Sequence, residues 1–187
     1  MKKLDMTNVQ EAGEFTKLPA GVYICTITDV QDLPSNEYLK VTYDIAVGEY
    51  AGYYKNQRDQ FPDRPWIGAY VKSYKTKALP MFKRFCTAVS RSNGNFVFDG
   101  GAINSNEKTL IGKKVGLILG EEEYYSNSGD VRTRLYVVRE FPVDKLTDQK
   151  VPQLKKLKEE PITPGAAADT SFLHATDGAT TDEVPFL

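Results

Sequence analysis

The residues between Tyr53 and Arg91 mix positive charge with aromatic rings. This stretch holds nine Lys or Arg residues and eight aromatic residues, against two acids, Asp59 and Asp63. Flat rings offer faces on which nucleic-acid bases stack, and cations between them neutralise phosphates. The mixture therefore suits a surface that holds unpaired nucleic acid without reading its sequence. The alternative is a basic solvated face whose rings turn into a core, since aromatic residues are usually packing residues.

A second basic and aromatic face is expected near the end of the body, in a strand over residues 131–139. One set of alternate positions is Val131, Thr133, Leu135 and Val137, and the other is Arg132, Arg134 and Tyr136. Because successive strand residues point to opposite faces, the second set repeats the pairing of cations with a ring. The alternative is a solvated edge strand in which Arg blocks aggregation.

The candidate nucleic-acid contacts are rings that would stack on bases and cations that would hold phosphates. The rings are Tyr53, Tyr54, Trp66, Tyr70, Tyr74 and Tyr136. The cations are Lys55, Arg58, Lys72, Lys75, Lys77, Arg132 and Arg134. Some of the rings must belong to the core, and the sequence does not say which. If residues 53–58 form a regular strand, only one of Tyr53 and Tyr54 meets the nucleic acid.

The elements that must position these side chains are short strands and one clear helix. Strands are predicted over residues 21–30, 39–47, 53–58, 113–123 and 131–139, with a hairpin loop at 126–129. Residues 66–77 fit either a strand or a mobile loop. A helix is predicted over residues 79–90, because Leu79, Phe82, Phe85, Cys86 and Val89 form a stripe at helical spacing. Residues 153–160 fit one or two polar helical turns.

This order of elements predicts a mainly β fold. Three strands, a helix and two further strands fit a five-stranded Greek-key barrel of the OB-fold type, with the helix between strands 3 and 4. Such barrels bind oligonucleotides on their sheet face and loops. Other five-stranded barrels and a small sandwich remain open alternatives.

Charge divides the chain into a basic body and an acidic end. Residues 1–158 hold all 24 Lys and Arg residues with 19 acids, a formal charge of +5, and residues 159–187 hold six acids and no Lys or Arg. We expect a flexible arm over residues 1–18, a binding domain over 19–158 and a disordered acidic tail over 159–187. The asymmetry suggests nucleic acid as one partner and a protein as another.

Residues for catalysis or cofactor binding are sparse, so we expect no enzyme, no cofactor and no metal site. The single histidine, His174, lies in the predicted tail, and the segment 111–116 lacks the spacing of a phosphate-binding loop. Glu121–Glu123 are adjacent in a predicted strand, and we expect their carboxylates to be solvated rather than to bind a metal. A metal-dependent nuclease built on Asp44, Asp59, Asp63 and Asp99 is an alternative that their spacing does not support.

Two cysteines far apart, Cys25 and Cys86, form neither a disulfide framework nor a zinc pattern. The N-terminus lacks the apolar run of a signal peptide, and no stretch has the length of a membrane span. We therefore expect a soluble, cytoplasmic protein that does not act at a membrane.

The body resembles the single-stranded-DNA-binding proteins encoded by phages of Gram-positive hosts. The matching residues are Gly21-Val-Tyr23, the run from Trp66 to Asn93 with Ser73-Tyr74-Lys75 and Phe82-Lys83, and Ile111-Gly-Lys-Lys-Val115 leading to Val131-Arg132. The resemblance covers roughly residues 18–145. It implies an OB-fold, sequence-independent binding of single strands in phage DNA replication or recombination, and a place in the host cytoplasm.

The last residues are similar to the acidic tip of bacterial single-stranded-DNA-binding proteins. The segment Asp182, Glu183, Val184, Pro185, Phe186 and Leu187 has acids, an aliphatic residue, a proline and an aromatic ring in that order. The similarity implies that the tip docks on replication and recombination enzymes. Leu187 follows the ring here, so the terminal carboxylate is not on Phe186.

The leading hypothesis is therefore a non-catalytic binder of single-stranded DNA. An interaction adaptor of the replication machinery is the alternative from another class, and a nuclease is the third. The sequence does not separate DNA from RNA. It leaves open a homo-oligomer and the length of nucleic acid that one chain covers.

Overall fold

The computed structural model describes residues 2–5, 7, 16–100 and 106–157. Its helices and strands are β1 (Gly21–Leu33), β2 (Tyr38–Ile45), α1 (Tyr53–Gln60), β3 (Ala69–Ser73), α2 (Leu79–Ser92), β4 (Lys114–Tyr125) and β5 (Val131–Phe141). Most of the predicted arm and the whole predicted tail, including its tip at 182–187, lie outside the described residues.

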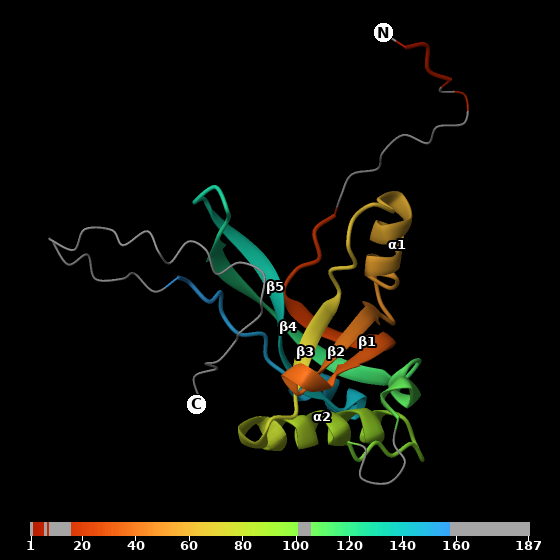
Figure 1. Cartoon of the computed structure of the whole chain (residues 1–187), viewed down its shortest axis with the longest axis vertical. Helices are drawn as coiled ribbons and strands as arrows, with labels where there is room; N and C mark the ends of the chain where they lie inside the picture. Colours follow the sequence, from red (N-terminus) through yellow and green to blue (C-terminus); the bar gives the residue numbers. More distant parts are fainter. Residues whose placement is uncertain (1, 6, 8–15, 101–105, 158–187) are drawn as a thin grey trace, which may run out of the picture. The chain divides into compact units, whose positions relative to one another are not determined.

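The five strands form one antiparallel sheet in the order β3-β2-β1-β4-β5. Helix α2 follows β3 along the chain and lies across the lower end of the sheet in Figure 1, while α1 lies at the opposite end. The prediction of a mainly β fold with one main helix between the third and fourth strands is confirmed. Each of β3 and β5 pairs with a single other strand among the described residues, so the sheet is open and its strand pairing does not make a barrel.

The core fills the space between the inner face of the sheet and α2. Alternating residues of β1 are fully buried, and a bulge after Ile27 shifts the alternation so that Val30 is also buried. The helix predicted over residues 79–90 is confirmed as α2, and Phe82, Phe85, Cys86 and Val89 of its stripe are buried. Leu79 departs from that stripe, because it is 48% exposed.

The prediction of a third strand over residues 53–58 is wrong, because these residues form helix α1. The third strand is β3, which lies within residues 66–77, the segment that fits either a strand or a loop by sequence. Lys55, Gln57 and Arg58 are good helix formers, so local propensity does not oppose the helix. The alternation of Tyr53 and Tyr54 between two faces therefore does not apply.

A buried carboxylate from β2 explains why a helix starts at this point. Asp44 Oδ1 accepts hydrogen bonds from the backbone N–H groups of Ile45 and Tyr54 at 2.8 and 2.9 Å, and Oδ2 accepts from Lys55 N–H at 3.0 Å. The first N–H groups of a helix have no partner within the helix, so an acceptor placed there stabilises the helix start. Asp44 does this from ten positions away in the chain, which no local sequence pattern shows.

Removing this cap should destabilise the fold measurably. We expect Asp44→Ala to lower the free energy of unfolding by about 2 kcal/mol, since three buried or part-buried N–H groups lose their acceptor. Urea denaturation followed by circular dichroism measures the loss. Asp59→Ala is the matched control, because it breaks only the exposed Lys55–Asp59 pair and should cost about 0.5 kcal/mol or less. Equal losses in the two variants would contradict the role of the cap.

The segment after β5 also differs from expectation. Residues 153–157 do not form the predicted helical turns but run extended beside β4. Lys155 N–H donates to the Glu121 carbonyl, and Glu123 N–H donates to the Lys155 carbonyl, both at 2.9 Å. This part of β4 extends beyond the end of β1, so its backbone groups need another partner, and the segment supplies it.

Candidate nucleic-acid interface

Most rings of the central stretch pack against each other between α1 and the sheet. The connected rings are Tyr23, Tyr50, Tyr53, Tyr54, Tyr43, Tyr70 and Trp66. Neighbouring rings meet mostly edge to face, with centroids 5.1 Å apart for Tyr53 and Tyr54 and 5.4 Å apart for Tyr43 and Tyr54. We call this set the tyrosine cluster. It attaches α1 to the sheet.

The polar atoms of this cluster are also used inside the fold. The Tyr53 hydroxyl accepts a hydrogen bond from Leu18 N–H, and Trp66 Nε1 donates to the carbonyls of Tyr43 and Gly68 at 3.2 and 3.1 Å. Tyr54 is 5% exposed, and burial raises its pKa to about 12. The alternative of core packing therefore describes these rings better than base stacking does.

The cations of α1 form a patch separate from the cluster. Lys55 and Arg58 are both exposed, and Lys55 pairs with Asp59 at 2.9 Å. Hydrogen bonding to Asp59 and its charge raise the pKa of Lys55. Just beyond the helix, the Arg64 guanidinium lies 4.2 Å above the Phe61 ring. This end of the molecule thus offers exposed charge and one accessible ring.

Lys72 is buried and holds the two edges of the sheet together. Its ammonium group lies 2.8 Å from the Glu140 carboxylate, and the two side chains are 11% and 2% exposed. Lys72 belongs to edge strand β3 and Glu140 to edge strand β5. This ion pair therefore joins two strands that are not paired with each other in the sheet. We call it the seam pair. The Lys72 side chain is therefore mostly covered and engaged with Glu140.

Tyr70 lies beside the seam pair in the interior. Its hydroxyl is buried and has no hydrogen-bond partner of normal geometry among the described residues. Burial, followed by the negative charge of Glu140, raises the pKa of Tyr70 well above its ordinary value. Tyr70 is thus half-buried against the core, with its hydroxyl in the interior.

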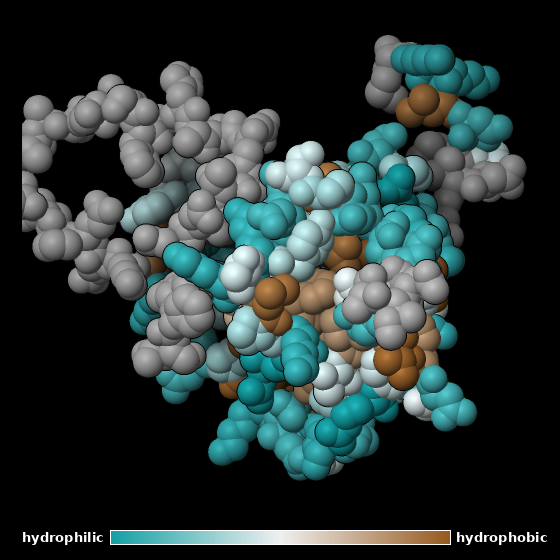
Figure 2. Space-filling view, turned by 60° about the horizontal axis from the view of Figure 1, so that its bottom comes forward, coloured by the Kyte–Doolittle hydropathy of each residue, from teal (hydrophilic) through white to brown (hydrophobic). Residues whose placement is uncertain are grey.

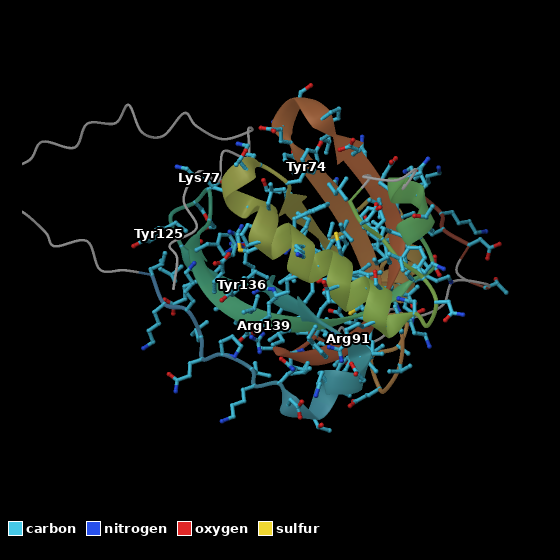
Figure 3. The ribbon with its side chains drawn as sticks, turned by 90° about the horizontal axis from the view of Figure 1, so that it is seen from below. Tyr74, Lys77, Arg91, Tyr125, Tyr136 and Arg139 are labelled. Carbon is cyan, nitrogen blue, oxygen red and sulfur yellow. The ribbon has the colours of Figure 1, made fainter. Side chains whose placement is uncertain are left out.

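The residues that follow β3 form an exposed basic surface. Lys75 and Lys77 are exposed, and Tyr74 is half-buried, with its hydroxyl donating to Asp32 at 2.8 Å and its ring against Phe82. Figure 3 shows Tyr74 and Lys77 near the first turn of α2. No acid occurs between Lys75 and Phe98, so no acidic residue of this segment offsets its charge.

The face predicted on β5 exists on the β4–β5 hairpin. Arg132, Arg134 and Tyr136 lie opposite Tyr124, Glu122 and Gly120, and directly opposite residues share a face. Leu135 and Val137 pack against the core from the other face, as expected.

This hairpin face is partly neutralised by contacts within the chain. Arg134 Nε donates to Glu122 at 2.9 Å, and its guanidinium lies 5.1 Å from the centre of the Tyr124 ring. Lys155 approaches both Glu122, at 3.4 Å, and the Tyr136 ring, at 5.9 Å. A phosphate could take the place of Glu122 beside these cations, because both anions accept hydrogen bonds from Arg and Lys.

Several exposed residues elsewhere on the sheet were not among the sequence candidates. Tyr125 is 65% exposed at the end of the hairpin, opposite Val131, which is 54% exposed. Arg139 is exposed on β5 and Lys40 on β2. The sequence does contain a signal for Tyr125, because two tyrosines directly precede the predicted hairpin loop and a ring there is expected near its tip. Lys40 and Arg139 are single cations in strands and carry no such signal.

The structure thus separates the predicted contacts into three groups. Tyr54 and Lys72 are buried, and Tyr53, Trp66 and Tyr70 are half-buried in the tyrosine cluster. Lys55 and Arg58 lie on α1. The others form two surfaces: Tyr74, Lys75 and Lys77 near α2, and Arg132, Arg134 and Tyr136 on the hairpin. Figures 1 and 3 both show the first turn of α2 and the tip of the β4–β5 hairpin on the left side of the molecule.

Within residues 2–5, 7, 16–100 and 106–157, no three His, Cys, Asp or Glu side chains come together as a candidate metal site. In the same part of the chain, no helix combines the length and apolar character that crossing a membrane requires. The partner-binding residues predicted at 182–187 fall outside it.

Comparison with known proteins gives no assignment. Neither a scan against models of protein families nor a search of curated protein sequences finds a match to this chain.

Proposed function

We propose that this chain is an OB-fold protein that binds single-stranded DNA without sequence preference and acts in DNA replication or recombination, in a phage context. The proposed fold is supported by the strand order β3-β2-β1-β4-β5 with α2 between β3 and β4. This is the order that results when a five-stranded Greek-key barrel is opened between its third and fifth strands. The seam pair bridges that opening, at 2.8 Å.

The observation that carries the binding proposal is the pair of basic, ring-bearing surfaces on one side of the molecule. A single strand that passes from the first turn of α2 to the hairpin would meet Lys75, Lys77 and Tyr74, then Arg134 and Tyr136. Binding through phosphates and stacked bases needs this combination and no base-specific donor or acceptor. We propose no catalytic step and no cofactor.

The acidic tip at 182–187 is proposed as a recruiting element for replication and recombination enzymes. The support is chemical and comes from the sequence: carboxylates suit a basic rim, and a ring with flanking aliphatic residues suits an apolar pocket.

A titration of the full chain against labelled oligonucleotides tests the binding proposal. We expect single-stranded DNA to bind more tightly than duplex of the same length. If about five phosphates are held, the affinity should fall about 100-fold between 50 and 200 mM salt, because bound cations are released in proportion to phosphate contacts. Fluorescence anisotropy at these two salt concentrations, with single-stranded RNA in parallel, measures both properties. Equal binding of duplex and single strand would contradict the proposal.

Two variants show whether the proposed surface is the one in use. Tyr136→Ala should weaken binding by about 1–3 kcal/mol if its ring stacks on a base, whereas Phe61→Ala on α1 should change little. Glu122→Gln should strengthen binding at low salt, because Arg134 and Lys155 lose their internal carboxylate partner. A chain in which neither Tyr136 nor Glu122 affects binding does not use the hairpin face.

An interaction adaptor remains the second candidate function. One observation favours it: an apolar groove lies between α2 and residues 97–99. Absence of salt-sensitive binding to any oligonucleotide would favour the adaptor over the nucleic-acid binder.

A further inference from the structure

A groove of about 550 Å³ lies between α2 and residues 97–99. Leu79, Phe82 and Cys86 line it from the helix, and Val97 and Phe98 line it from the segment that follows. Figure 2 views the face that carries α2 and shows apolar residues at the surface among hydrophilic ones. The volume falls within the range of about 300–1,000 Å³ typical of sites for small ligands. The groove thus suits one or two bulky side chains rather than a flat domain surface.

The two borders of the groove expose apolar side chains that α2 does not bury. Leu79 is 48% exposed and Val97 is 73% exposed. The floor is continuous with the core, since Phe82, Cys86 and Phe98 are 8%, 7% and 4% exposed. Exposed apolar side chains that border an apolar floor are typical of an interaction site, whereas isolated ones are not.

Among the described residues, the charged side chains that line the groove are two cations, Lys83 and Arg91, and one acid, Asp99. Lys83 lies on the rim and is exposed. A partner segment that carries carboxylates would complement this border.

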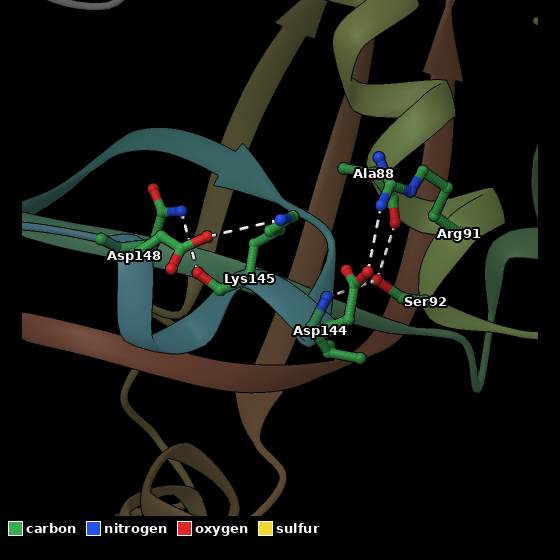
Figure 4. A network of polar contacts seen from close by, with 8 residues as sticks. Ala88, Arg91, Ser92, Asp144, Lys145 and Asp148 are labelled. Atoms are coloured by element: carbon green, nitrogen blue, oxygen red, sulfur yellow. Dashed lines mark hydrogen bonds and ion pairs between the residues drawn. The ribbon is translucent and has the colours of Figure 1, made fainter.

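The far end of the groove is held in place by contacts with residues after β5. Arg91 pairs with Asp144 at 3.0 Å, and the Ser92 hydroxyl donates to the Ala88 carbonyl and accepts from Val143 N–H (Figure 4). The charge of Arg91 is therefore used within the fold. Lys83 is left as the rim cation available to a partner.

We propose that this groove binds a short acidic segment of a partner protein, with a bulky apolar side chain between Leu79 and Val97 and a carboxylate beside Lys83. Nucleic acid fits this place less well. Bases need an open ring face, and the rings here, Phe82 and Phe98, are less than a tenth exposed. The groove adjoins the proposed DNA surface, since Leu79 lines it and the Phe82 ring packs against Tyr74.

The test uses a fluorescein-labelled peptide of roughly ten residues, in which a central Phe-Leu pair is flanked by Asp and Glu, titrated with the full chain. We expect saturable binding. Val97→Asp should weaken it about tenfold or more, because a charge enters an apolar contact, and Lys83→Glu should weaken it severalfold. Arg58→Glu makes the same charge change on α1, at the other end of the molecule, and should leave binding unchanged. Val97 and Lys83 are exposed, so these variants should fold.

Four results would overturn the proposal. The first is no saturable binding of the peptide. The second is equal weakening by Lys83→Glu and Arg58→Glu, which would indicate unspecific charge attraction. The third is displacement of the peptide by single-stranded DNA together with weaker DNA binding of Val97→Asp, which would assign the groove to nucleic acid. Peptide binding by Val97→Asp that matches the unaltered chain would exclude this groove as the site.

Discussion

Lys72→Met should lower the free energy of unfolding by about 3–5 kcal/mol, because it leaves the Glu140 carboxylate buried without a counter-charge. Glu140 is 3% exposed. The variant also removes the contact that joins β3 to β5. The midpoint of urea denaturation, followed by circular dichroism, measures the loss.

The double variant Lys72→Met with Glu140→Leu separates buried charge from lost packing. It should recover most of the stability, since replacing a buried ion pair by apolar residues is often neutral or stabilising. Lys77→Met, at an exposed position close by in the chain, should change stability by about 0.5 kcal/mol or less. A loss in Lys72→Met no larger than that in Lys77→Met would contradict a structural role for the seam pair.

The double variant also tests the prediction from the sequence that Lys72 binds a phosphate. If Lys72 acts only across the seam, the refolded double variant should bind single-stranded DNA as the unaltered chain does. If the double variant instead binds single-stranded DNA more weakly, and its affinity depends less steeply on salt, Lys72 contacts a phosphate in the complex.

The second large effect is expected in alkaline solution, where the free energy of unfolding should fall by about 5 kcal/mol from about pH 9 to about pH 11. Burial raises the pKa of Cys25, Tyr43 and Tyr70 above their ordinary values, and that of Cys86 to about 11. These groups keep their protons in the folded chain at a pH where the unfolded chain has released them. The unfolded state is therefore favoured increasingly as the pH rises, and the stability present below about pH 9 is lost.

Tyr70→Phe is the matched variant for this effect. Its stability at neutral pH should change little, because the Tyr70 hydroxyl has no hydrogen-bond partner of normal geometry among the described residues. From about pH 10 to pH 11 it should lose about 1 kcal/mol less than the unaltered chain, since one buried titrating group is gone. Urea midpoints at several pH values measure both. An unchanged slope in Tyr70→Phe would show that Tyr70 titrates normally and is open to solvent.

The sequence by itself determined the elements whose signals are local. The alternation in β1, β2, β4 and β5 and the helical stripe of α2 appear within short windows, because side-chain direction repeats every two residues in a strand and every three to four in a helix. The position of α2 between the third and fourth strands followed directly. The basic face of β5 was also predicted, because it needs only alternation along one strand.

Only the tertiary structure decided which residues of the central stretch face solvent. Helix α1 depends on Asp44, a cap from another element, and the rings of Tyr54 and Tyr70 are covered by partners distant in sequence. The buried position of Lys72 depends on Glu140, which lies 68 residues further along. Composition shows only that rings and cations are present. Whether a ring packs on another ring or stacks on a base depends on which surfaces the fold brings together. The same holds for whether a lysine pairs with a carboxylate or with a phosphate. Those contacts are long-range, so no window of the sequence contains both partners.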